Sequence, residues 1–101
     1  MDFIFIDKDG KTYASLKGVV GTMQCESLEA EIAPLMDPSR NYVELNCSGL
    51  EYISSSGLRL LFTLQKNISA HKGKFVITQP SDYLANLLHI TGFDRFITIE
   101  K

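Results

Sequence analysis

Three consecutive serines, Ser54, Ser55 and Ser56, stand before Gly57 and a strongly apolar run with helical periodicity. This spacing predicts that the serines lie at the N-terminus of a helix, where unpaired backbone N–H groups meet the positive end of the helix dipole. A serine oxygen there can cap the helix or carry a phosphate without disrupting the fold. Most serines before helices are capping or turn residues, so the residues alone favour a structural role.

The other side chains offer little catalytic chemistry. The sequence contains neither the G-x-S-x-G motif of serine hydrolases nor a glycine-rich phosphate-binding motif. His71 and His89 each lack a carboxylate or cysteine at ligand spacing, and Cys25 and Cys47 do not form a C-x-x-C pair. We therefore expect no enzymatic activity, no metal, no cofactor, and two reduced, partly buried thiols. Weak nucleotide binding stays open.

The composition predicts one globular domain over residues 1–101, because 45% of the residues are hydrophobic and 22% are charged. The formal net charge is −2 and the basic residues are scattered, which argues against binding to nucleic acid or an anionic membrane surface. The apolar run at 3–6 is too short for a signal peptide or a membrane span. We expect a cytoplasmic protein without membrane insertion, a monomer or weak dimer, whose partners are proteins.

The elements that would position the serines follow from the hydrophobic pattern. Strands are predicted at 3–6 and 12–17, joined by an Asp9-Gly10 turn, and the glycines Gly18 and Gly21 should end the second strand. The later strands are predicted at 42–47, 74–78 and 96–99. Because helices separate these later strands, they should form a mostly parallel sheet.

Three helices are predicted between the strands. The first carries apolar residues at Cys25, Leu28, Ile32, Leu35 and Met36, and Pro34 should end or kink it. The second buries a stripe of Leu58, Leu61, Phe62, Gln65 and Ile68, has Leu60 and Leu64 beside that stripe, and stops at Gly73. The third begins after Pro80-Ser81-Asp82, with Leu84, Leu87 and Leu88 inward, and ends at Gly92. The predicted order is β-β-α-β-α-β-α-β, an α/β fold with an antiparallel N-terminal hairpin.

The chain resembles the STAS domain, and most closely the stand-alone anti-sigma factor antagonists of bacteria. The resemblance covers the chain essentially from end to end. It is carried by Gly18, by Leu45-Asn46-Cys47-Ser48-Gly49-Leu50, by Tyr52-Ile53-Ser54-Ser55-Ser56-Gly57-Leu58, and by Ile90-Thr91-Gly92-Phe93. The central segment is the most specific of these.

The resemblance implies roles for individual residues. In this family the serine two positions before the glycine accepts a phosphate, and here that serine is Ser55. Asn46 and Ser54 stand where many members have an aspartate, and Gly21 falls near a position that is often Asp or Asn. These departures bear on which kinase recognises the chain. The expected partner-binding residues are Asn46, Ser54, Ser56, Gly57, Leu58, Arg59 and Leu60.

The resemblance also implies a partner-switching cycle. The unmodified antagonist would bind a serine-kinase anti-sigma factor, a histidine-kinase-like ATPase, and so free a sigma factor for transcription. Phosphorylation at Ser55 would switch the antagonist off, and a metal-dependent serine/threonine phosphatase would restore it. The alternative is a constitutive STAS subunit of a lipid-transport complex or stress-sensing scaffold, in which the serine is structural.

Overall fold

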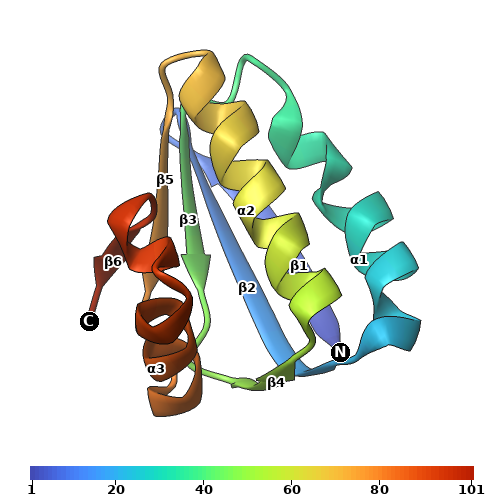
Figure 1. The fold of residues 1–101 in the computed structure, drawn as a ribbon. Helices are drawn as coiled ribbons and strands as arrows, with labels where there is room; N and C mark the ends of the chain where they lie inside the picture. The colour runs from blue at the N-terminus through green and yellow to red at the C-terminus, as the bar shows by residue number, and fades with distance from the viewer.

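The computed structural model describes all residues from 1 to 101 and contains one mixed sheet with three α-helices (Figure 1). The strands are β1 (Asp2–Lys8), β2 (Lys11–Val20), β3 (Tyr42–Asn46), β4 (Leu50–Ile53), β5 (Lys74–Thr78) and β6 (Thr98–Glu100). The helices are α1 (Cys25–Ile32), α2 (Ser55–Ala70) and α3 (Asp82–Thr91). Three short 3₁₀ segments are η1 (Thr22–Gln24), η2 (Ala33–Met36) and η3 (Phe93–Arg95).

The sheet has the order β1-β2-β3-β5-β6, and β4 pairs with the far end of β2. Only β1 and β2 are antiparallel; all other neighbouring strands are parallel. The helices α1 and α2 lie side by side over one face of the sheet (Figure 1). A core of 20 buried residues joins these helices to the sheet. The predicted α/β class, with an antiparallel hairpin followed by parallel strands, is confirmed.

Local turn and cap predictions are confirmed as well. Asp9 and Gly10 both have positive φ, 53° and 78°, which is the conformation of a tight hairpin turn. The helix α1 ends at Ile32, and the chain continues as the 3₁₀ segment η2 with Pro34 near its start. Gly92 ends α3 in the left-handed conformation, with φ of 79°.

Three predicted element boundaries are wrong, and one strand was not predicted. Gly18 does not end β2, because the strand bends there at a φ of 88° and continues to Val20 with a shifted register. The residues 50–53 form a separate strand, β4, that the sequence analysis did not identify. The last strand begins at Thr98, since the two residues before it lie in the turn after η3. The helix α2 ends at Ala70 with His71 as its C-cap, before the predicted stop at Gly73, and Lys72 has a left-handed φ of 65°.

The core stripe of α2 differs from the predicted one at three positions. Leu64 is fully buried, whereas Phe62 and Gln65 are only half-buried. The ring of Phe62 stacks on that of Phe93, with centroids 4.7 Å apart. Leu60 is half-buried and packs against the core, so it offers a partner only part of its side chain.

At Gly57, the first turn of α2 packs tightly against β4 and β2. A Cβ atom on Gly57 would lie 2.8 Å from Cγ1 of Ile53 and 3.0 Å from Cγ1 of Val20. Both of these neighbours are buried, so neither can move aside freely. The glycine therefore sets how near the N-terminus of α2 approaches β4 and β2.

We expect Gly57→Ala to lower the free energy of unfolding by about 1–3 kcal/mol, because the added methyl group overpacks this contact. Alanine has the higher helix propensity, so a loss of stability would identify the contact as the cause. The control is Gly49→Ala, whose Cβ would lie 2.9 Å from Cγ and 3.3 Å from Cβ of Lys17, an exposed side chain that can relieve the contact by rotating about χ1, whereas Ile53 and Val20 are buried. Urea unfolding measures both variants, and equal stabilities would contradict the prediction.

Candidate functional site

The site predicted from the serines lies at the junction of β4 and α2. Ser54 follows β4 in extended conformation and is the N-cap of α2, since its Oγ accepts a hydrogen bond from the backbone N of Gly57 at 3.2 Å. The backbone N of Ser54 donates to the carbonyl O of Val20 at 2.8 Å. The Ser54 side chain is nearly buried, with its Oγ 3.6 Å from Sγ of Cys25. Ser54 is therefore a structural cap.

Ser55 and Ser56 have a different environment from Ser54. They are the first two residues of α2, and both are exposed. The hydroxyl of Ser55 makes no hydrogen bond within the protein. The backbone N–H groups of both residues have no partner within the helix, because they belong to its first turn. No acidic residue in this turn offsets the positive end of the helix dipole.

Asn46 lies at the end of β3 and orders the loop that leads to β4. Its Oδ1 accepts hydrogen bonds from the backbone N of Ser48 at 2.9 Å and from Oγ of Ser48 at 2.8 Å. Its Nδ2 lies 3.5 Å from Oε1 of Gln79. The Asn46 side chain therefore stabilises the loop, and no hydrogen bond links it to Ser55.

The other residues predicted to meet a partner divide into two groups. Gly57 and Leu58 are buried, so they support the exposed residues of the site and cannot contact a partner directly. Ser56 and Arg59 are exposed beside Ser55, and Leu60 is half-buried. Among the predicted partner-binding residues, Ser56 and Arg59 are therefore the exposed polar ones.

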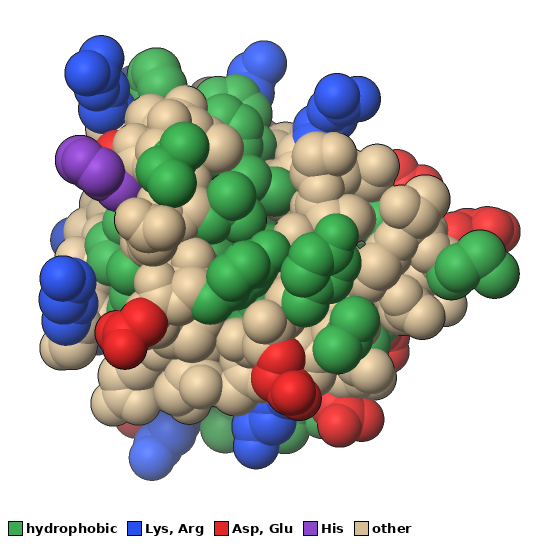
Figure 2. All heavy atoms as spheres, turned by 60° about the horizontal axis from the view of Figure 1, so that its bottom comes forward, with side chains coloured by type: hydrophobic (Ala, Val, Ile, Leu, Met, Phe, Trp, Pro, Cys, Tyr) green, Lys and Arg blue, Asp and Glu red, His purple; other side chains and the backbone are tan.

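A group of exposed apolar residues near this junction was not predicted from the sequence. Val19 and Tyr52 are register partners on β2 and β4, and the ring of Tyr52 lies 6.1 Å from that of Tyr83 on α3. We call these three residues the apolar row; they are 48%, 46% and 40% exposed, and Met23 on η1 is 88% exposed. Figure 2 views the molecule from the end where β4 and the start of α2 lie, and hydrophobic side chains gather across it. The row could not be predicted without β4.

Tyr83 also closes the free edge of β4. Its hydroxyl donates to the carbonyl O of Ile53 at 3.1 Å and lies 3.4 Å from the backbone N of the same residue. This contact ties α3 to the strand that precedes the buried Ser54 and the exposed Ser55. The hydrogen bond between Tyr83 and Ile53 therefore fixes the position of Tyr83 in the apolar row.

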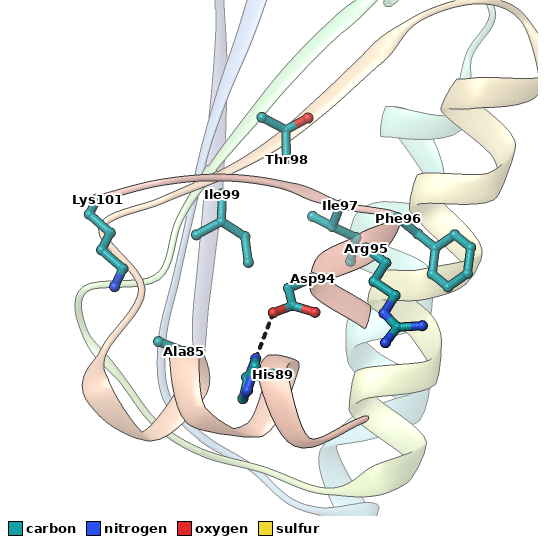
Figure 3. A pocket seen from close by; sticks show the side chains of 9 residues that line it. All are labelled: Ala85, His89, Asp94, Arg95, Phe96, Ile97, Thr98, Ile99 and Lys101. Carbon is teal, nitrogen blue, oxygen red and sulfur yellow. Dashed lines mark hydrogen bonds and ion pairs between the residues drawn. The ribbon is translucent and has the colours of Figure 1, made fainter. Parts of the chain in front are cut away.

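The largest depression of the surface lies elsewhere. It has a volume of about 640 Å³, is formed by α3, η3 and β6, and contains no residue of the serine turn (Figure 3). Nδ1 of His89 pairs with Oδ2 of Asp94 there at 3.1 Å, and the His89 side chain is exposed. Nothing in this arrangement connects the depression to Ser55.

The thiols and histidines form no cluster that could hold a metal ion. Cys47 is buried, which raises the pKa of its thiol to about 12, and Cys25 is partly exposed; neither forms a disulfide. Nε2 of His71 lies 3.4 Å from the carbonyl O of Arg40. None of the helices has the length and apolar character needed to cross a membrane.

The fold and the serine junction together define a mixed α/β domain with an exposed serine at the start of its second α-helix. Comparison with known families matches residues 12–101 to the STAS domain. The chain belongs to the STAS domain family. The match begins at the second residue of β2, so it contains the sheet from β2 onward and the whole serine junction.

Among known proteins, the chain is 35% identical over 85 residues to the anti-sigma factor antagonist BtrV of Bordetella bronchiseptica. The match covers 84% of this chain and 73% of BtrV. An anti-sigma factor antagonist structure from Mycobacterium paratuberculosis has a TM-score of 0.87 at 21% identity, covering 98% of this chain and 84% of that one. The chain is thus related to the anti-sigma factor antagonists within the STAS family.

The antagonist SpoIIAA has the same fold. Its unphosphorylated form matches with a TM-score of 0.81 at 17% identity, covering 99% of this chain and 89% of that one. Its phosphorylated form, from Bacillus, matches with a TM-score of 0.76 at 17% identity, covering 99% and 92%. At this level of identity the likeness concerns the fold.

The different roles of neighbouring serines can be tested by stability. We expect Ser54→Ala to lower the free energy of unfolding by about 1 kcal/mol, because α2 loses its N-cap. Ser55→Ala should change the stability by less than about 0.5 kcal/mol, because its exposed hydroxyl makes no bond. Urea unfolding of the two variants provides the measurement. A larger loss for Ser55→Ala than for Ser54→Ala would reverse the assignment of the cap.

Proposed function

We propose that this chain binds a serine-kinase anti-sigma factor in its unphosphorylated form, frees the sigma factor, and is switched off by phosphorylation at Ser55. The observation that carries the proposal is the state of the Ser55 hydroxyl, which is exposed and unbonded at the first position of a 16-residue helix. Ser54 differs from it, because its hydroxyl caps the helix. Ser56 is exposed as well, and the choice of Ser55 over Ser56 rests on the resemblance to the family.

The start of α2 suits a phosphate because of its electrostatics. Phosphorylation adds a charge of roughly −1.5 to −2 and three acceptor oxygens. The unpaired N–H groups of the first turn and the positive end of the helix dipole favour such a group. Arg59 is exposed four residues after Ser55, so it lies one helical turn further along the same side of α2. The domain should therefore keep its fold when it is phosphorylated.

The apolar row explains how the same phosphate would prevent binding. Val19, Tyr52 and Tyr83 offer a partner apolar contact next to Ser55. A partner seated on them would have to desolvate a doubly charged group at Ser55. A penalty of about 3 kcal/mol already weakens binding roughly a hundredfold. The switch would thus act on the complex and not on the fold of the domain.

The cycle needs two enzymes, and both act on this chain as their substrate. The anti-sigma factor would transfer the γ-phosphoryl group of ATP to Oγ of Ser55, releasing ADP and the hydroxyl proton. A metal-dependent serine/threonine phosphatase would hydrolyse the ester and return the hydroxyl. The chain itself needs no catalytic group for either step.

The proposed phosphorylation site can be tested by intact-mass measurement. The purified chain is mixed with a serine-kinase anti-sigma factor, Mg²⁺ and ATP, and we expect the mass of one added phosphate. Ser55→Ala should abolish this addition, whereas Ser54→Ala and Ser56→Ala should retain it. Retention of the phosphate by Ser55→Ala would contradict the proposal.

Binding measurements test the switch separately from the site. The phosphorylated chain should bind the anti-sigma factor at least about a hundredfold more weakly than the unmodified chain. Tyr52→Ala should weaken the unmodified complex, because it removes part of the apolar row. Equal affinity of both forms would favour the constitutive assembly role and rule out the switch.

A further inference from the structure

The strand β1 forms a free edge of the sheet. It stands at one end of the strand order and pairs only with β2. None of the backbone hydrogen bonds formed by turns, loops and caps involves residues 2–8. Edge strands are usually protected against pairing by proline, a bulge or an inward-pointing charge. The centre of β1, residues 3–6, consists of alternating phenylalanine and isoleucine and has none of these devices.

The side chains at this edge leave an apolar surface open. Phe3 and Phe5 point toward the helices and pack against the core, while Ile4 and Ile6 point to the opposite face. Ile4 is 69% exposed and Ile6 is 61% exposed. With Tyr13 of β2 they line an apolar hollow of about 210 Å³. Two large aliphatic side chains in water on an unpaired edge suggest a surface that another strand can cover.

We propose that a second copy of this chain pairs with this edge, so that two β1 strands join antiparallel about a two-fold axis and form one continuous sheet. Opposed residues in an antiparallel pair point to the same face, so a symmetric pairing must oppose residues of equal parity. With the axis at Phe5, Asp2 lies opposite Lys8 of the second copy and Ile4 lies opposite Ile6. Both copies use the same surface, as an isologous dimer requires.

Charge complementarity selects this register. Within one hairpin, Lys8 lies opposite Lys11, and Asp2 lies opposite Lys17. The pairing places Asp2 of the second copy beside Lys8, on the side away from Lys11. There its negative charge offsets the repulsion between Lys8 and Lys11. The two-fold symmetry repeats this contact once more. Moving the axis by one residue to Ile4 would place Asp2 opposite Ile6 and leave Lys8 without a partner.

The same register gathers the apolar side chains. Ile4 is the register partner of Ser15, and Ile6 is the register partner of Tyr13. Across the two-fold axis, two Ile4 and two Ile6 side chains then form a block of four, with a Tyr13 ring at either side. The block shields in part from water the two most exposed hydrophobic side chains of β1, at the centre of the interface.

Sedimentation equilibrium of the full chain over a range of concentrations tests the proposal. We expect a reversible dimer whose dissociation constant rises at least about tenfold in Ile6→Lys. Asp2→Lys should also weaken the dimer, because it places two lysines opposite each other, and the double variant Asp2→Lys with Lys8→Asp should restore it. All of these side chains are exposed, so thermal unfolding should show that the monomer stays folded.

The control is Ile90→Lys, which replaces a side chain that is 71% exposed on α3 and should leave the dimer unchanged. A wild-type chain that is monomeric up to its solubility limit would overturn the proposal. A dimer that survives Ile6→Lys, or a double variant that fails to restore association, would do the same. None of these outcomes depends on Ser55, so they are distinct from a failure of the phosphorylation switch.

Discussion

Three hydrogen bonds at Ser54 determine the geometry of the serine junction. Its Oγ accepts from the backbone N of Gly57, its backbone N donates to Val20, and its carbonyl O accepts from the backbone N of Leu58 at 2.9 Å. Together they join the end of β2, the exit of β4 and the first turn of α2. Because Ser54 supplies the cap, the hydroxyl of Ser55 has no part in holding the fold. A group that the fold does not use can be modified at little cost to stability.

The features that could be predicted from the sequence depend on interactions within a few residues. The Asp9-Gly10 turn, the end of α1 near Pro34, the start of α3 near Pro80-Ser81-Asp82 and the stop at Gly92 all follow from the backbone preferences of the residues themselves. The placement of Ser55 at the start of α2 belongs to this group, since the serines precede a long periodic run. The STAS fold itself was inferred through resemblance, and the strand order confirms it.

The features that could not be predicted depend on contacts between distant segments. The strand β4 has only four residues, exists by pairing with β2, and has its free edge closed by Tyr83 from α3. Without that strand, nothing in the sequence places Tyr52 beside Val19. The burial of Leu64 in place of Gln65 has a similar cause, because the direction of the stripe on α2 is set by the helix and sheet against which it packs. The periodicity of the sequence predicts that α2 has an apolar stripe, but not which side of the helix axis faces the sheet most directly.

The bend at Gly18 lies between the part of β2 that pairs with β1 and β3 and the part that pairs with β4. The strand β2 pairs with β3 over residues 12–15 and with β4 over residues 18–20. The positive φ of Gly18, which other residues rarely adopt, lies where the register shifts between these two pairings. Before the bend, β2 supports β1 and its exposed isoleucines; after it, β2 holds β4 and the start of α2. One strand therefore supports the edge proposed to pair with a second copy and the helix terminus proposed to be phosphorylated, on different backbone segments, so changes at either surface need not disturb the other.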